Sequence, residues 1–225
     1  MNLLCGVVGV IFAFHGRQEA ALVAMLAAAV FDFCDGLAAR ALGAYSDIGK
    51  ELDSLCDVVS FGVLPTVMMF CTAGALGISG IWPYFTLPLC VFSALRLAKF
   101  NVDERQHDSF IGLATPPSAM ICAALCAWAA SDPTGPVASI CAAPWVLPAL
   151  ACCLSLLLVS EIPMFAFKFG KGKEADARTR TLRWIFLAAT AVCVALVVLL
   201  SWHWSAVILL TFASYVIINL IAAAI

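Results

Sequence analysis

The chain has few charged residues: of its 225 residues, 12% are Asp, Glu, Lys or Arg, whereas 64% are hydrophobic. Soluble domains carry about 25% charged residues, so this composition excludes an ordinary soluble protein. A membrane-spanning helix needs about 20 mostly apolar residues, so the length accommodates roughly eight spans and leaves no room for a separate soluble domain. The sequence therefore predicts an all-α, polytopic membrane helix bundle that forms one domain over residues 1–225.

Signatures of several other protein classes are also missing. The 11 cysteines include no CxxC pair and the three histidines stand apart from one another, so nothing indicates a zinc site. No Ser–His or Cys–His arrangement indicates a dedicated nucleophile. The N-terminus lacks the basic region and the cleavage site of a signal peptide. We expect no nucleic-acid partner and no internal repeat.

Eight apolar stretches follow one another along the chain. They lie at about residues 3–14, 20–40, 52–76, 80–100, 113–131, 136–160, 182–202 and 204–225. The first stretch is short, so its helix either is incomplete at its start or begins at the membrane interface. We expect each stretch to form one transmembrane helix.

Basic residues lie almost entirely in alternate connections. Eleven of the 12 follow the second, fourth and sixth stretches: Arg40, Lys50, Arg96, Lys99, Arg105, Lys168, Lys171, Lys173, Arg178, Arg180 and Arg183. Only Arg17 falls on the other side. Because Lys and Arg collect in cytoplasmic loops, we expect both termini and these connections to face the cytoplasm from the inner membrane.

Four carboxylates interrupt the apolar pattern within residues 31–57. Asp32 and Asp35 are three residues apart and Asp53 and Asp57 are four apart, so each pair shares one face of a helix. The glycines of the intervening ALGAYSDIG segment suit a tight reversal that brings the pairs together. We therefore expect the four side chains to converge.

Such a cluster requires compensation for its charge. A single aspartate at the centre of a membrane helix costs about 2.5–3.5 kcal/mol. Oxygen ligands suit hard divalent cations, and Mg²⁺ favours a few carboxylates together with substrate phosphates. The constellation predicts a site for Mg²⁺ or Mn²⁺ and a phosphate-bearing substrate.

Small residues are interleaved with the aspartates. Gly36, Ala39 and Gly49 either clear space for a ligand between the helices or let the helices approach closely. Arg40 offers a fork that suits a carboxylate or a phosphate.

These residues together form a known signature. The pattern Asp35-Gly36-x2-Ala39-Arg40-x8-Gly49-x3-Asp53-x3-Asp57, preceded by Asp32, resembles the complete signature of the CDP-alcohol phosphatidyltransferases. The resemblance implies that family's fold and the transfer of a phosphatidyl group from a CDP-linked lipid to an alcohol, with release of CMP. Because many relatives are homodimers, the resemblance also implies a homodimer.

The resemblance implies roles for the aspartates. Asp32, Asp35 and Asp53 would be the principal ligands of two divalent ions. Asp57 would be a ligand or neighbour of the metals and the general base for the acceptor hydroxyl. This agrees with the chemistry, since metals make CMP a better leaving group and a nearby carboxylate accepts the hydroxyl proton.

The donor pocket is implied in the same way. Gly36, Ala39 and Gly49 would line the cytidine pocket of CDP-diacylglycerol, and Arg40 would steady the cluster. Asn2 matches an asparagine that lies near the nucleotide in the family. The alternative is that Asn2 is an ordinary polar residue at the interface.

Two longer stretches narrow the acceptor. GKELDSLCDVVSFGVLPTVM (residues 49–68) and FSALRLAKFNVDERQHDSFIGLATPPSAM (residues 92–120) resemble the bacterial and archaeal phosphatidylserine synthases. Where that subgroup reads G-L-P, this chain has Gly112-Leu113-Ala114, and we expect a modest change in loop rigidity. The last two helices, at about residues 182–225, match by hydropathy only and are expected to be peripheral to the catalytic core.

A serine acceptor requires a cation for its carboxylate. Arg96, Lys99 and Asn101 follow the apolar part of the fourth stretch, and the two basic residues at i and i+3 can share one face. These three residues are candidates for binding serine or a lipid phosphate. The alternative is that the basic side chains simply reach toward the interface.

Other functions remain open at this point. A relative that uses glycerol 3-phosphate or an inositol phosphate would need a further basic cluster, which the sequence does not show. A cation-coupled transporter also keeps aspartates in helices, but it predicts acidic residues near the midplane and inverted repeats. A non-catalytic scaffold explains none of the aspartate spacing. The expected function is transfer of a phosphatidyl group from CDP-diacylglycerol to L-serine at the cytoplasmic face of the bilayer.

Overall fold

The computed structural model describes residues 1–43, 46–102, 110–164 and 177–224, with the side chains of residues 40, 47, 110, 111 and 177–179 outside the description. The elements up to the middle of the chain are α1 (Asn2–Phe14), α2 (Gln18–Leu42), α3 (Asp47–Asp57), the π-helix η1 (Val58–Val63), α4 (Leu64–Ala75), the 3₁₀-helix η2 (Trp82–Thr86) and α5 (Pro88–Val102). The remaining elements are β1 (Phe110–Ile111), α6 (Thr115–Ser131), α7 (Pro136–Cys141), α8 (Val146–Val159), β2 (Pro163–Met164), α9 (Ala177–Leu199) and α10 (Ser205–Ala224). The predicted all-α class is confirmed.

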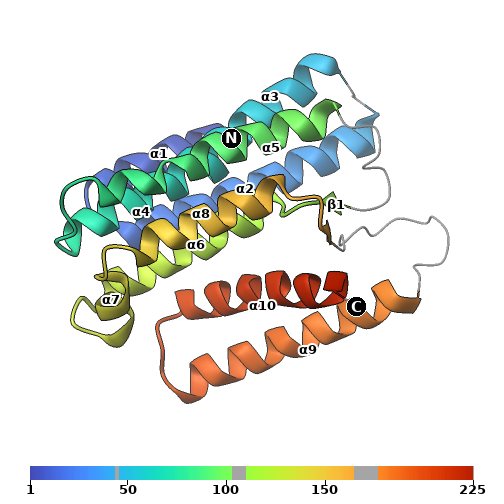
Figure 1. Cartoon of the computed structure of the whole chain (residues 1–225). Helices are drawn as coiled ribbons and strands as arrows, with labels where there is room; N and C mark the ends of the chain where they lie inside the picture. The colour runs from blue at the N-terminus through green and yellow to red at the C-terminus, as the bar shows by residue number, and fades with distance from the viewer. Residues whose placement is uncertain (44–45, 103–109, 165–176, 225) are drawn as a thin grey trace.

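The helices form one bundle in which the α9–α10 hairpin is a layer of its own (Figure 1). α1 packs on α2, and α6 contacts α2, α4 and α10, whereas α9 contacts chiefly α10. The buried positions of α6 are mostly Ala, Ser and Cys. Small side chains of this kind let neighbouring helix backbones approach closely within a membrane.

Within the described part of the chain, five helical segments are long and apolar enough to cross a membrane: Gln18–Ala39, Ile48–Ala75, Trp82–Val102, Arg180–Leu199 and Ser205–Ala224. This fits an integral membrane protein. α1 and α8 are apolar but shorter. Each of the predicted stretches contains a helix, whereas their count of eight transmembrane spans stays a prediction.

The long helix from residue 47 to residue 75 is interrupted by one wide turn. The N–H of Leu64 bonds to the carbonyl of Val59, five residues earlier. Pro65 follows directly; it lacks an N–H, and its ring would crowd the carbonyl of Phe61 in a regular α-helix. The π-helix η1 relieves this conflict immediately after Asp57, and π-turns are frequent at functional sites.

One end of the bundle gathers several helix termini. The ends of α2 and α5 and the start of α3 lie at the upper right of Figure 1, and α9 begins at the lower right, at the same end of the bundle. Lys50, Arg96, Lys99 and Arg180 belong to these termini, whereas Arg17 lies at the other end of α2. The predicted cytoplasmic residues Arg105, Lys168, Lys171 and Lys173 lie outside the described residues, and Arg178 is described by its backbone alone.

A short strand pair ties the start of α6 to the end of α8. β1 pairs antiparallel with β2. Next to it Gly112 has a φ of +77°, and a Cβ there would lie 2.7 Å from the carbonyl oxygen of Ser160. Only glycine fits such a position. Ala114, which replaces the subgroup's proline, has φ −70° and ψ 148°, angles that proline also adopts.

Candidate active site

The last turns of α2 present the first pair of carboxylates. Asp32 is half-buried and Asp35 is exposed, three residues apart on the helix. α2 ends at Gly43, whose φ of +61° is left-handed and whose N–H bonds to the carbonyl of Ala39. This conformation favours glycine, so the predicted reversal begins where the sequence places it.

α3 presents the second pair. It begins after Ser46, whose Oγ accepts a hydrogen bond from the N–H of Gly49 at 3.0 Å. A Cβ on Gly49 would lie 3.0 Å from the same Oγ. Gly49 therefore lies in the first turn of α3 and leaves room for its cap, rather than forming the reversal itself. Asp53 and Asp57 follow on this helix.

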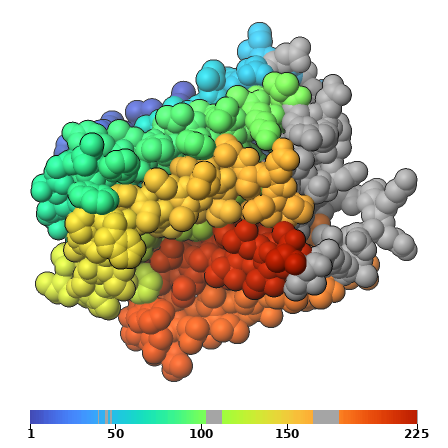
Figure 2. Space-filling view, viewed as in Figure 1, coloured from blue at the N-terminus to red at the C-terminus, as the bar shows by residue number. Residues whose placement is uncertain are grey.

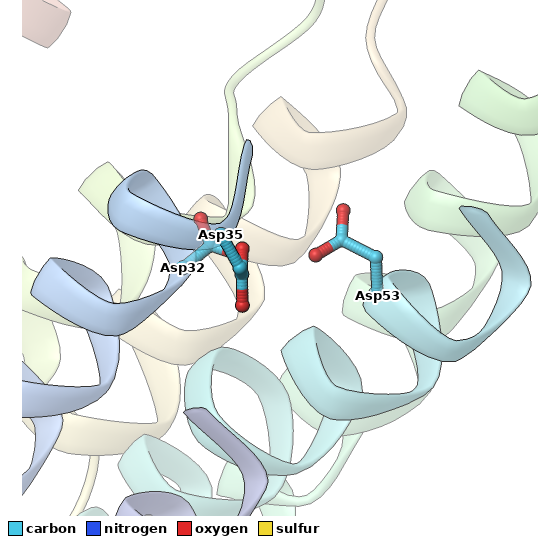
Figure 3. Close-up of side chains that lie close together, drawn as sticks. All are labelled: Asp32, Asp35 and Asp53. Atoms are coloured by element: carbon cyan, nitrogen blue, oxygen red, sulfur yellow. The ribbon is translucent and has the colours of Figure 1, made fainter. Parts of the chain in front are cut away.

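Three of the four carboxylates converge between the two helices. Asp32 and Asp35 from α2 face Asp53 from α3, and one oxygen of each lies within 4.8 Å of the others (Figure 3). Two unit charges at that separation repel by about 3 kcal/mol at an effective dielectric constant of 20. The arrangement is therefore suited to a divalent cation, because bound positive charge removes this repulsion.

Asp57 is held deeper, by the start of α1. The side-chain Nδ2 of Asn2 donates to Oδ1 of Asp57 at 2.9 Å and to Oδ1 of Asp32 at 3.3 Å. Asn2 is 2% exposed, so this amide bridges two carboxylates from two other helices inside the protein. The expectation that Asn2 is an ordinary interfacial polar residue does not describe this contact.

Close packing brings α1 to this position. Gly6 lies so near η1 that a Cβ there would be 3.0 Å from the Cα of Ser60. A Cβ on Gly9 would be 2.6 Å from a methyl carbon of Leu64. The Oγ of Ser60 also donates to the carbonyl of Asn2 at 3.2 Å. These contacts fix the start of α1, and hence Asn2, beside the carboxylates.

The small residues of the signature differ in their surroundings. A Cβ on Gly36 would meet nothing within 4 Å, so no described neighbour requires glycine there. Ala39 lies half-buried one turn later. Open space beside the carboxylates is what a ligand needs. The backbone of Arg40 lies on α2, but its side chain is outside the described residues.

The three candidate acceptor residues on α5 have different environments. Arg96 is 8% exposed, interacts electrostatically with Asp57, and its Nη1 lies 3.5 Å from Oγ1 of Thr115. Lys99 is partly exposed and its Nζ lies 3.8 Å from Oε1 of Glu161. Because Arg96 is buried near Asp57, the alternative that its side chain simply reaches toward the interface does not describe it. That alternative still fits Lys99.

Asn101 has a contact that the sequence did not suggest. Its Nδ2 donates to Oγ of Ser54 at 2.9 Å, and its carbonyl accepts from Nζ of Lys50 at 3.0 Å. These bonds join the end of α5 to the start of α3. The structure therefore brings Arg96 near Asp57, and Asn101 joins α5, which carries Arg96, to α3, which carries Asp57.

One residue near the site is missing from the sequence prediction. Tyr215 on α10 is 6% exposed and interacts electrostatically with Arg96. Its ring meets that of Phe186 edge-on, with centroids 5.9 Å apart. The signal in the sequence is a tyrosine within a strongly apolar helix. Hydropathy does not predict which distant residues come into contact, so the pairing with Arg96 could not be predicted from it.

The donor set of this cluster suits a divalent cation. Three carboxylates accessible from one side suit hard cations that also bind phosphate oxygens. Asp57 is held by an amide donor and is near a buried guanidinium. A carboxylate in such a setting can accept a proton from a hydroxyl group that the cluster brings close.

Comparison with known proteins adds independent findings. A family model for CDP-alcohol phosphatidyltransferase matches residues 1–157. The CDP-diacylglycerol–serine O-phosphatidyltransferase of Bacillus subtilis is 33% identical over 168 residues, which cover 74% of this chain and 86% of the relative. The protein of that name from Mycobacterium leprae is 32% identical over 223 residues, which cover 96% of this chain and 70% of the relative.

An archaeal protein is also similar. The archaetidylserine synthase of Methanothermobacter thermautotrophicus is 34% identical over 122 residues, which cover 53% of this chain and 52% of the relative.

Proposed function

Because this chain belongs to the CDP-alcohol phosphatidyltransferase family, we propose that it is a phosphatidylserine synthase. It transfers the phosphatidyl group of CDP-diacylglycerol to the hydroxyl of L-serine and releases CMP. The observation that carries this proposal is the convergence of Asp32, Asp35 and Asp53 within 4.8 Å, with Asp57 beside them. The names of the relatives support serine as the acceptor.

The family is dependent on divalent cations, and the acidic triad fits such ions. We propose that Asp32, Asp35 and Asp53 hold two of them, Mg²⁺ or Mn²⁺, with Asp57 as a further ligand or neighbour. When bound, the ions neutralise charge on the pyrophosphate and make CMP a better leaving group. These carboxylates, from α2 and α3, would hold the ions.

Asp57 is proposed as the general base. Asn2 donates to Oδ1 of Asp57 and would hold this carboxylate in place to accept the proton of the serine hydroxyl. The deprotonated hydroxyl attacks the β-phosphorus of the donor in line with departing CMP. Asn2 also donates to Asp32, so it holds the base at a set distance from the proposed metal ligands.

The donor nucleotide is proposed to lie against the end of α2 and the start of α3. Open space at Gly36 supports a cytidine pocket formed with Ala39 and Gly49. Arg40 follows on the same helix as a candidate partner for a phosphate or carboxylate. The lipid chains would extend sideways between helices into the bilayer.

Arg96 is the strongest candidate for recognising serine. Its buried guanidinium near Asp57 is suited to the serine carboxylate, and it lies close enough to orient the hydroxyl toward the base. Lys99 is a second candidate, for serine or for a lipid phosphate. Asn101 contributes, in this proposal, by holding α5 against α3 through Ser54.

The placement of the basic residues supports a proposal for the orientation of the enzyme in the membrane. We propose that the end of the bundle with the carboxylates, and both termini, face the cytoplasm from the inner membrane. We also propose that the chain forms one catalytic domain over residues 1–225, with the helices of about 182–225 peripheral to its core, and that it is a homodimer.

The decisive experiment measures CMP release from CDP-diacylglycerol by the purified full chain with Mn²⁺ or Mg²⁺. L-serine, glycerol 3-phosphate and myo-inositol phosphate are compared as acceptors. We expect release with serine only, reduced about 100- to 10,000-fold in Asp57→Asn because general base catalysis is lost.

Asp132→Asn is the matched control, since Asp132 follows α6 and lies away from the cluster. It should retain wild-type activity. Release that depends on another acceptor would overturn the serine assignment while keeping the family chemistry. Full activity in Asp57→Asn would overturn the proposed base.

A further inference from the structure

The loop that follows α8 carries an exposed carboxylate beside the end of α5. Oε1 of Glu161 lies 3.8 Å from Nζ of Lys99, which follows Arg96 by one turn of the same helix. The side chain of Glu161 is 74% exposed. α8 packs against α5, and Figure 2 shows the two helices side by side, in gold and in green. A solute that approaches this end of the bundle can therefore reach the Glu161 carboxylate directly.

The backbone on either side of Glu161 is held against the start of α6. The N–H of Gly112 donates to the carbonyl of Ile162 at 2.9 Å. The carbonyl oxygen of Ser160 lies 2.7 Å from the position that a Cβ on Gly112 would take. The pairing of β1 with β2 continues these contacts. The loop therefore presents the Glu161 side chain from a fixed point of the backbone.

The segment that holds this loop also contacts Arg96. Thr115 follows Gly112 by three residues, and its Oγ1 lies 3.5 Å from Nη1 of Arg96. The guanidinium carbon of Arg96 lies 5.0 Å from the centroid of the Phe100 ring. Two routes thus connect Glu161 with Arg96, one through Lys99 on α5 and one through the start of α6. They place an accessible anion and a buried cation at the same end of α5.

The acceptor requires a partner for its ammonium. Serine, the acceptor in the proposed function on which this inference rests, carries a carboxylate and an ammonium on the carbon next to its hydroxymethyl group. Arg96 suits the carboxylate, whereas the four signature aspartates are assigned to the metal ions and to the base. Among the described side chains, two further carboxylates lie at this end of the bundle, those of Glu51 on α3 and Glu161. Of these two, Glu161 is the one that the structure places beside an ammonium group.

We propose that Glu161 binds the ammonium of the acceptor and is a specificity-determining residue for amino-acid acceptors. The acceptor carboxylate lies against Arg96 and its ammonium donates to Glu161, which leaves the hydroxyl to face Asp57. Lys99 stands in for this ammonium when no acceptor is bound. Its Nζ is beyond hydrogen-bond distance of Glu161, and exposed ion pairs contribute little, so an acceptor replaces it at small cost. The negative charge of Glu161 also disfavours acceptors that carry a phosphate in place of the ammonium.

The test uses two serine analogues that lack the hydroxyl. L-alanine keeps the ammonium and the carboxylate, and propionate keeps the carboxylate alone. Each is titrated as an inhibitor of serine-dependent CMP release by the purified full chain. We expect the wild type to bind L-alanine about tenfold more tightly than propionate, as one charge-assisted hydrogen bond provides.

Glu161→Gln should abolish this preference. The inhibition constant of L-alanine should rise to that of propionate, whereas the constant of propionate should stay within about threefold of the wild-type value. The KM for serine should rise about tenfold with kcat nearly unchanged, because the ammonium contact is made equally in the ground state and the transition state. Glu51→Gln is the matched control, an exposed glutamate at the same end of the bundle, and should keep the wild-type preference.

Three results would refute the proposal. They are a wild type that does not prefer L-alanine, a Glu161→Gln variant that keeps the preference, and a Glu161→Gln variant that loses affinity for both analogues equally, as a purely structural role predicts. Absence of CMP release with serine in the wild type would instead refute the proposed function.

Discussion

The α1–α5 region and the α9–α10 hairpin are both apolar, yet they use their polar side chains differently. In the first region several polar side chains bond between helices, as Asn2 does with Asp32 and Asp57, beside others such as Ser54 that donate within their own helix. In the hairpin, Thr190, Ser214 and Asn219 donate to carbonyls of their own helices. Those acceptors are the carbonyls of Phe186, Thr211 and Tyr215.

The difference follows from how closely the helices approach. Gly6 and Gly9 let α1 contact η1 and α4 directly, whereas residues 177–224 contain no glycine. A polar side chain can reach a neighbouring helix only where the backbones are near, and otherwise it satisfies itself within its own helix. The family match covers residues 1–157, which include the first region and exclude the hairpin. The proposed catalytic site therefore lies where small residues bring the helices together.

The largest expected effect is the loss of a carboxylate in the first region. Asp53→Asn should lower serine-dependent CMP release about a thousandfold, because metal assistance is worth several kcal/mol of transition-state stabilisation. Removal of divalent ions with a chelator should abolish the activity of the wild type, and added Mn²⁺ or Mg²⁺ should restore it. Full activity in the presence of the chelator would contradict the proposed requirement for divalent ions.

A smaller effect is expected at the amide that bridges the carboxylates. Asn2→Ala removes the donors to Asp32 and Asp57, and loss of such a supporting contact typically costs 10- to 100-fold in activity or metal affinity. We expect a lower kcat and a higher Mn²⁺ concentration for half-activation. The matched variant Asn219→Ala removes a buried amide from the hairpin. If it changed the metal requirement as strongly, the contrast between the regions would fail.

The sequence predicted much of the first region because its features are local. Spacings of three and four residues place Asp32 with Asp35 and Asp53 with Asp57, and the structure brings three of these together. The positions of the helices followed from hydropathy in the same way. Fixed helical periodicity makes both inferences possible without tertiary information.

Features that depend on tertiary contact were not predictable. The bridge from Asn2 spans 55 residues to Asp57. The turn at η1 depends on Pro65 within a helix whose continuity is maintained by its neighbours. The approach of Tyr215 to Arg96 joins segments with no common motif. In each case the determining partner lies on another helix or in an irregular turn, where residue spacing carries no information.

Substitutions that disturb the close packing of α1 should have smaller effects than substitutions of the carboxylates or of Asn2. Gly6→Ala places a methyl group 3.0 Å from the Cα of Ser60, a backbone atom that cannot move aside. The free energy of unfolding should therefore fall by about 1–3 kcal/mol. Thermal unfolding in detergent measures this. Gly74→Ala, where a Cβ meets nothing, should be neutral or slightly stabilising. Ala188→Val on the exposed side of α9 should also change little. Equal destabilisation by all three would show that α1 is not specially packed.

The smallest expected effect tests a contact through which the hairpin approaches the site, that of Tyr215 with Arg96. Tyr215→Phe removes only a hydroxyl and keeps the edge-on contact with Phe186. If that hydroxyl helps to orient Arg96, the KM for serine should rise about two- to tenfold with kcat nearly unchanged, because one modest polar interaction is lost. A purely structural role would instead lower thermal stability and leave KM unaltered. A selective change in KM would place part of acceptor recognition on a helix beyond the family match, and so limit the contrast between the two regions to the catalytic carboxylates themselves.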